Sequence, residues 1–221
     1  MKFRHEYKHR INALDVMLLR QRLRPLLKYD ENSKENGMYF IKSLYFDNYN
    51  DTALREKLDG VDNREKFRIR YYNNDTSFIR LEKKSKINGL CAKEKAIITA
   101  EQCRKIIDND IDFLKKSNEP LFQELYAKMQ YRLLRPKNIV AYERECYVYK
   151  PGNVRITLDF DIRGSYNIQR FLEPDVHMTQ LYHTAILEGK WDEYLPQFIK
   201  DAVQLKNRKS SSFSKYAAVR F

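Results

Sequence analysis

Basic residues recur at every second position in several stretches of this chain that have the composition of β-strands. Arg68 and Arg70 stand two apart in KFRIRYY, as do Lys93 and Lys95 in CAKEKAII. Side chains two apart point to the same face of a strand, so each of these strands has one cationic face. Neighbouring cationic faces repel one another, and we therefore expect an anionic ligand between them. The alternate positions form an apolar face, with Phe67, Ile69, Ile79, Leu81 and Ile97.

The overall charge agrees with an anionic ligand. The chain has 221 residues and a formal net charge of +12. A basic excess of this size favours polyanions, such as nucleic acid, anionic lipid or phosphate chains. The six glycines and six prolines form no low-complexity linker, which argues against loosely tethered units. We therefore expect a single domain over residues 1–221.

The cysteines indicate the compartment. Cys91, Cys103 and Cys146 follow no metal-binding spacing, and they are typical of reduced thiols in a cytosolic protein. No apolar run reaches the roughly 18 residues that span a bilayer, and the first residues contain no signal-peptide core. We expect a soluble cytoplasmic protein, which a separate membrane partner could still hold at a membrane.

The order of strands, turns and helices predicts an α+β fold. Because tight turns join the longest strands, the sheet should be antiparallel and closed into a barrel, with helices flanking it. A closed barrel has one inward face per strand, so the cationic faces would line a tunnel. Strands are expected at 2–10, 38–46, 64–72, 76–86, 90–98, 138–149, 154–163 and 182–190. Helices are expected at 12–28, with Leu14, Met17, Leu18 and Leu23 inward, and at 51–58, 100–108, 119–134 and 192–205.

The polar side chains of these strands suit phosphoryl transfer, in which the protein aligns phosphates and neutralises their charge. Arginine binds phosphate oxygens with two parallel hydrogen bonds, and lysine supplies a point charge. Mn²⁺ or Mg²⁺ needs only one or two carboxylates beside phosphate oxygens, so Glu188 is the predicted metal ligand and Glu6 the second candidate. The other candidates are Lys8, Arg68, Arg70, Lys84, Lys93, Tyr142, Arg144, Arg155, Ser214 and Lys215.

Each of these signals also has a purely structural interpretation. Glu82 could form a cross-strand ion pair, Glu6 could balance Lys8, and Asp159 and Asp161 could pair with neighbouring arginines. The distribution of the whole set over five or more strands favours the tunnel. The chain has no glycine-rich phosphate loop and no Gly-x-Ser-x-Gly motif, which argues against a P-loop enzyme and a serine hydrolase of that type.

The ordered motifs resemble a known family, the polyphosphate-polymerase domain of the vacuolar transporter chaperone (VTC) complex, within the triphosphate tunnel metalloenzyme superfamily. The resemblance extends from about Phe3 to Tyr216. It implies an eight-stranded antiparallel tunnel in which the γ-phosphate of ATP is transferred to a growing polyphosphate chain, with Mn²⁺ or Mg²⁺. The motifs are RHEYK, SLYFDN, FRIRYY, LEKK, AKEK, AYER, VRITLD, ILEGK and SFSKY.

The resemblance also implies a role for each matched residue. Glu188 matches the metal-ligand glutamate, and the matched tunnel residues are Lys8, Arg68, Arg70, Lys84, Lys93, Tyr142, Arg144, Arg155, Ser214 and Lys215. Arg4 stands where the wider superfamily has a glutamate, which fits the polymerase branch better than the triphosphatase branch. Ser212 stands where the family often has a second lysine. The sequence lacks the family's phosphate-sensing and membrane domains, so any transport would need a separate membrane subunit.

Three functions follow from these observations. The first is a polyphosphate polymerase that uses ATP, and the second is a triphosphatase of the same fold. The third is a polyanion-binding module without catalysis, for which the 16 tyrosines and 12 phenylalanines would provide stacking surfaces. Most of the aromatic residues fall on the expected core face or in helices, so nucleic acid is an unlikely partner.

Overall fold

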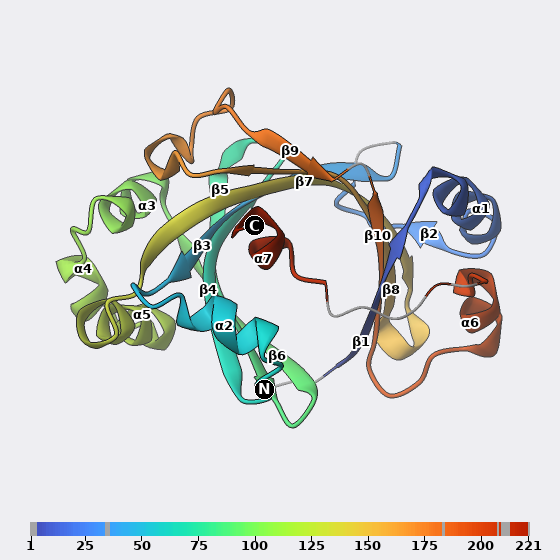
Figure 1. Ribbon diagram of the computed structural model, residues 1–221, viewed down its shortest axis with the longest axis horizontal. Helices are drawn as coiled ribbons and strands as arrows, with labels where there is room; N and C mark the ends of the chain where they lie inside the picture. The colour runs from blue at the N-terminus through green and yellow to red at the C-terminus, as the bar shows by residue number, and fades with distance from the viewer. Residues whose placement is uncertain (1–3, 34–35, 183, 207, 209–212, 221) are drawn as a thin grey trace.

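The computed structural model describes residues 4–33, 36–182, 184–206, 208 and 213–220 (Figure 1). The strands are β1 His5–Ile11, β2 Lys28–Tyr29, β3 Met38–Asp47, β4 Arg64–Tyr72, β5 Asp75–Ile87, β6 Leu90–Ile98, β7 Arg135–Tyr149, β8 Val154–Ser165, β9 Thr179–Tyr182 and β10 Ala185–Trp191. The helices are α1 Ala13–Leu23, α2 Thr52–Leu58, α3 Ala100–Ile107, α4 Asp112–Lys115, α5 Pro120–Tyr131, α6 Gln197–Val203 and α7 Lys215–Arg220, with short 3₁₀ turns at Pro151–Asn153 and Ile168–Arg170.

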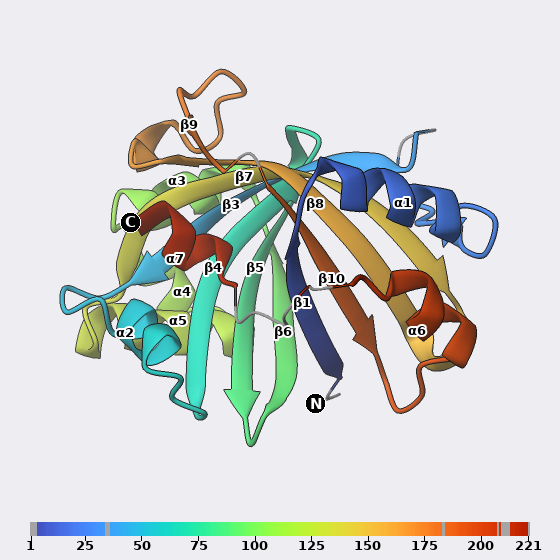
Figure 2. The ribbon, with the colours of Figure 1, turned by 45° about the vertical axis from the view of Figure 1, so that its right-hand side comes forward.

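The strands form one antiparallel sheet that curls around α7 (Figure 1). Its main path runs β1-β10-β8-β7-β3-β4-β5-β6, while β2 pairs with β7 and β9 with β8. The edge strands β1 and β6 are joined by one isolated bridge, between Arg4 and Cys91 (Figure 2). The α+β class and the antiparallel sheet are confirmed. The fully closed barrel is not, because no continuous ladder joins β1 to β6 in the described residues.

Local turn chemistry explains the hairpins β4–β5 and β5–β6. Asn73 and Asn74 connect β4 to β5 with positive φ angles of 52° and 57°. Asn88 and Gly89 connect β5 to β6, again with positive φ angles, of 50° and 78°. Two successive residues with positive φ are typical of type I′ turns, which match the twist of paired strands. Both hairpins were expected from the sequence.

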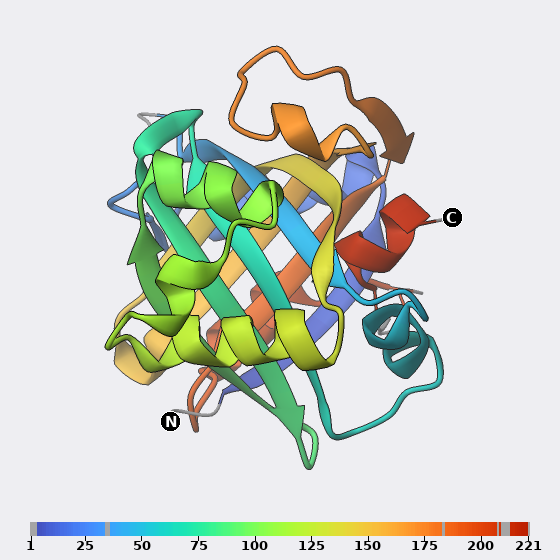
Figure 3. The same ribbon diagram turned by 90° about the vertical axis from the view of Figure 1, so that its left-hand side faces the viewer.

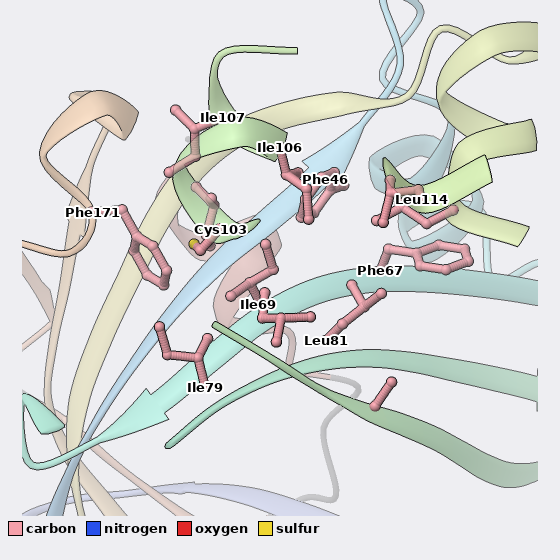
Figure 4. Close-up of a cluster of buried hydrophobic side chains, with 14 of the residues drawn as sticks. Phe46, Phe67, Ile69, Ile79, Leu81, Cys103, Ile106, Ile107, Leu114 and Phe171 are labelled. Carbon is pink, nitrogen blue, oxygen red and sulfur yellow. The ribbon is translucent and has the colours of Figure 1, made fainter. Parts of the chain in front are cut away.

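The convex face of β3–β6 is covered by α3, α4 and α5 (Figure 3). The expected apolar positions Phe67, Ile69 and Leu81 are buried in this layer (Figure 4). Thr99 begins α3 with a capping box, because its side chain and that of Gln102 each accept a backbone N–H of the other residue. Ile97 was wrongly assigned to the apolar face. It is 66% exposed, because alternation places it with Lys93 and Lys95.

Helices α1 and α6 cover the convex face of β8 and β10 on the other side of the molecule (Figure 1). Both helices are shorter than expected. α1 ends at Leu23, two residues before Pro25, because proline has no backbone N–H to continue the helical hydrogen bonds. α6 begins after Pro196, where the fixed φ angle of proline suits a helix start. Asn12 caps α1.

The orientation of α1 differs from the expectation. Leu14, Met17 and Leu18 were expected to point inward, but they are exposed. The residues that α1 buries against the sheet are Val16, Leu19 and Leu23. These positions are spaced i, i+3 and i+7 and therefore share one helix face. Leu23 is the one member of the expected inward set that is buried.

The helix α7 was not predicted from the sequence, nor were the short strands β2 and β9. Tyr216 and Val219 of α7 are buried against Tyr45, Val140 and other residues of the concave face. The Tyr216 hydroxyl donates to Asp47 at the end of β3, at 2.6 Å. No helix of the described residues is both long and apolar enough to cross a membrane.

Candidate active site

The concave face of the sheet collects most of the predicted site residues. Alternation along each strand points one residue in two toward α7, and the curl brings distant strands together. Lys84 on β5 and Glu6 on β1 are 78 positions apart, yet Lys84 Nζ lies 3.0 Å from Glu6 Oε2. Lys215 of α7 lies 4.6 Å from the ring centre of Tyr142 on β7. Ion pairs link residues of β1, β5, β7, β8, β10 and α7 inside the curl, and Arg68, Glu82 and Lys93 form a second group.

Glu188 on β10 is surrounded by cations. Its carboxylate lies 2.6 Å from Lys190 Nζ, 3.5 Å from Lys8 Nζ and 3.2 Å from Arg144 Nη2. Burial by itself would raise the pKa of Glu188, but Lys190, Lys8 and Arg144 hold that pKa well below the ordinary value. Glu188 is therefore an ionised carboxylate at neutral pH.

Glu6 on β1 shares the same cations. Its carboxylate lies 2.8 Å from Lys8 Nζ and 3.4 Å from Lys190 Nζ, besides the contact with Lys84. Burial opposes ionisation, yet Lys8, Lys190 and Lys84 together lower the pKa of Glu6 to about 2. The contact between Glu6 and Lys8 confirms the interpretation that Glu6 balances the charge of Lys8.

These two carboxylates fit a metal ion only in part. Among the described residues, no group of three or more histidine, cysteine, aspartate or glutamate side chains is placed to hold a metal. Mg²⁺ is commonly held by one or two carboxylates together with substrate phosphates and water. Glu188 and Glu6 could supply these one or two carboxylates, and phosphate oxygens would complete the coordination of the ion.

The paired arginines of β4 differ in their partners. Arg68 Nη2 lies 2.6 Å from Glu82 Oε2, and its Nη1 donates to the Tyr45 hydroxyl at 3.1 Å. Arg70 donates to two neutral groups, Ser43 Oγ at 2.9 Å and the Tyr142 hydroxyl at 3.1 Å. Arg70 is 5% exposed, and among the described residues it forms no ion pair. It is thus a buried cation held in place by hydroxyl groups.

Glu82 on β5 neutralises two cations, Arg68 on β4 and Lys93 on β6. The cross-strand ion pair considered for Glu82 is therefore present. Burial lowers the pKa of Lys93 to about 7, since Arg68 and Arg70 also disfavour its charge and Glu82 only partly offsets them. An anion entering the site would favour the charged form of Lys93.

Asp159 on β8 binds two further predicted residues. Arg144 donates to both of its carboxylate oxygens, at 2.6 and 2.8 Å. Lys215 Nζ lies 2.5 Å from Oδ2 of the same carboxylate. Asp159 is fully buried, and Arg144 and Lys215 lower its pKa against the opposing effect of burial.

Arg155, Ser214 and Asp161 have partners outside the Glu188 and Glu82 groups. Arg155 forms an ion pair with Asp30, in the segment after β2. The Ser214 hydroxyl accepts the backbone N–H of Ala217 at 3.4 Å in the first turn of α7. Asp161 has a positive φ of 48° where the register of β7 and β8 shifts. It pairs with Arg163, as its structural interpretation predicted. Ser212 lies outside the described residues.

Sequence reasoning missed two residues of this site. Lys190 contacts both Glu188 and Glu6, and the two-residue spacing Glu188–Lys190 could have indicated it. Tyr45 is buried beneath Tyr216, with their ring centres 5.3 Å apart. Burial would raise the pKa of Tyr45, but Arg68 and Arg70 lower it to about 8. The alternation of Ser43 and Tyr45 in SLYFDN was the available signal.

Comparisons with known proteins agree with this architecture. The PH1012 protein of Pyrococcus horikoshii shares the fold, with a TM-score of 0.52, 11% identity and coverage of 98% of this chain and 99% of that chain. The bh2851 protein of Bacillus halodurans aligns with a TM-score of 0.48 and 13% identity, over 86% of this chain and 80% of that chain. A comparison with curated proteins found no match. The VTC domain matches residues 3–220, and the chain therefore belongs to the VTC domain family.

Proposed function

We propose that this protein is a metal-dependent polyphosphate polymerase, which transfers the γ-phosphate of ATP to a growing inorganic polyphosphate chain. Membership of the VTC domain family supports a tunnel-fold enzyme. Polyphosphate is a linear polyanion, so its enzyme needs cations along a path rather than at one point. Such cations come from β1, β4, β5, β6, β7 and β10, and from α7. This distribution supports a substrate that runs along the inside of the curled sheet.

The environment of Arg70 is the observation that carries the proposal. A buried guanidinium that lacks an anionic partner is costly unless a ligand neutralises it. Two hydroxyl groups fix the position of Arg70. The charge of Glu82 also acts on Arg70, but the ion pairs of Glu82 are with Arg68 and Lys93. Its planar fork matches two oxygens of a phosphate group. We infer that Arg70 binds a nucleotide phosphate, with Arg68 and Lys93 beside it.

The carboxylates of Glu188 and Glu6 support a metal-dependent reaction. We assign Mn²⁺ or Mg²⁺ to Glu188, with Glu6 as the second ligand. The ion would stabilise the charge that develops on the phosphate oxygens during transfer. Lys8 and Lys190 hold both carboxylates in position within the concave face. Arg144 on β7, which contacts Glu188, would then also contact the substrate.

One observation favours the alternative, a triphosphatase of the same fold. α7 packs inside the curl beside the ends of β3 and β8, where Tyr216 bonds Asp47 and the Tyr166 hydroxyl donates to the carbonyl of Val219. A helix in that place shortens the path that a long polymer could follow. A short triphosphate that releases free phosphate needs less room.

Product analysis separates these functions. The purified protein is incubated with ATP and Mn²⁺, the polymer is resolved on a gel, and free phosphate is assayed in parallel. Lys8→Ala and Glu188→Ala are expected to abolish the polymer. Lys105→Ala and Glu101→Ala are matched controls, because these residues form an exposed i,i+4 pair on α3. They should leave synthesis unchanged.

The pattern of products decides between the candidates. A polymer ladder that both site variants lose supports the polymerase. Free phosphate without polymer at any time point supports the triphosphatase. Full polymer synthesis by Glu188→Ala would refute the metal assignment. Salt-sensitive polyphosphate binding without any turnover of ATP would leave a binding module.

A further inference from the structure

The helix α1 has a second apolar face, which points away from the protein. Leu14 is 74% exposed, Met17 66% and Leu18 37%. Their spacing of i, i+3 and i+4 places them side by side on one face. Leu14 is the most exposed large aliphatic side chain that the structure describes. This outer face does not contribute to the core, because α1 already buries its opposite side against the sheet.

Basic residues flank this outer face. At 100° per residue, Arg22 and Arg24 fall on opposite sides of the line through Leu14, Leu18 and Gln21. The Arg24 side chain is 57% exposed, and Arg24 shares the single carboxylate of Glu145 with Arg20. Arg22 donates to the carbonyl of Gln204. Two nearby acids are each paired with an arginine, Asp15 with Arg208 and Asp161, which lines a pocket beside Met17, with Arg163. The residues around the apolar strip therefore retain an excess of positive charge.

We propose that the outer face of α1 docks onto an anionic lipid bilayer. Three aliphatic side chains cover much less than the approximately 800 Å² per partner of a stable protein interface. Shallow insertion of such side chains, combined with arginines at the level of lipid phosphates, is sufficient for reversible membrane binding. The sign of the flanking charge selects anionic lipid over neutral lipid. This inference does not depend on the reaction inside the sheet.

Sedimentation with vesicles tests the proposal. The full chain is mixed with vesicles of phosphatidylcholine alone, or with vesicles that also contain 30% phosphatidylglycerol. This fraction is chosen to resemble an anionic leaflet with a surface potential of about −30 mV or more negative. We expect binding to the anionic vesicles only. The double variant Leu14→Ser, Met17→Ser should bind at least about tenfold more weakly, since two inserted aliphatic groups are lost. Its melting temperature should not fall, because both side chains are exposed.

The matched control is Tyr131→Ser. Tyr131 is 84% exposed and lies on α5, on the opposite side of the molecule (Figure 1). The Tyr131→Ser variant should bind vesicles as the unmodified chain does. Unchanged binding by the double variant would assign the vesicle contact to cations elsewhere and overturn the proposal. The absence of binding to both kinds of vesicle would also overturn the proposal. A dimer in solution that the double variant abolishes would do the same, because the outer face of α1 would then contact a second copy of the chain.

Discussion

Arg144 on β7 donates Nε and Nη2 to the two carboxylate oxygens of Asp159 on β8, at 2.6 and 2.8 Å. Neighbouring strands bring these residues opposite one another in the register. Asp159 also receives Lys215 from α7. One buried carboxylate therefore connects the helix inside the curl to the sheet that surrounds it.

Asp159→Asn is expected to destabilise the protein by about 3–5 kcal/mol, because two buried cations lose their common counter-charge. Urea denaturation measures this loss. Asp161→Asn is the matched control on the same strand. Its carboxylate pairs with the half-exposed Arg163, so its effect should stay below about 1 kcal/mol. Equal losses in the two variants would contradict a special role for Asp159.

Glu82→Gln is expected to strengthen the binding of tripolyphosphate about tenfold. Arg68 and Lys93 lose the carboxylate that now neutralises them, and the site gains one unit of positive charge toward the anion. Isothermal titration calorimetry measures the affinity. Glu94→Gln is the control, because Glu94 pairs with Lys83 rather than with the site. Weaker binding by Glu82→Gln would show that Glu82 orients Arg68 more than it competes with phosphate.

The affinity for tripolyphosphate should depend on the charge of Lys93. Its pKa of about 7 means that Lys93 loses its proton as the pH rises from 6 to 8.5, so that binding weakens over this range. Lys93→Arg keeps its charge at every pH in this range and should flatten the profile. The difference between the two profiles isolates Lys93 from the ligand's own titration. Parallel profiles would disprove the assignment.

Lys42 should make stability depend on pH in the alkaline range. Its side chain is fully buried and donates to the carbonyl of Glu173, and burial lowers its pKa from 10.5 to about 8. Between these values the unfolded chain binds more protons than the folded chain, so the free energy of unfolding rises with pH.

The variant Lys42→Met removes this titration. Between pH 8 and 10.5 the stability of the unmodified chain should gain up to about 3 kcal/mol relative to Lys42→Met. Denaturation curves at several pH values measure that gain. Lys105→Met, at an exposed site on α3, should show no relative change. A constant difference between Lys42→Met and the unmodified chain would contradict the lowered pKa.

The strands and their faces could be predicted from the sequence because both depend on local properties. Period-two alternation separates Arg68 and Arg70 from Phe67 and Ile69 whatever the rest of the chain does. The pairs Asn73–Asn74 and Asn88–Gly89 favour type I′ turns by themselves. These features are sufficient to predict an antiparallel sheet with one cationic face.

The face of α1 that packs against the sheet could not be predicted from local properties. Leu14, Met17 and Leu18 form one apolar face, and Val16, Leu19 and Leu23 form another. A helix with two apolar faces gives no periodic signal that selects the buried one. The sheet surface that it meets makes that choice, since only contact with β8 and β10 removes one face from water.

The alternation of cations along several strands, with carboxylates among them, can be read from the order of residues. The pairing of each carboxylate with a particular cation depends on the folded sheet. Glu6 meets Lys84, Asp159 meets Lys215, and Arg70 donates to hydroxyl groups without forming an ion pair in the part of the chain that the structure describes. Each of these contacts joins segments far apart in the chain, and each depends on the register and curl of the whole sheet. Charge interactions weaken with distance. Which cations have a carboxylate within reach is therefore determined only when the fold is complete.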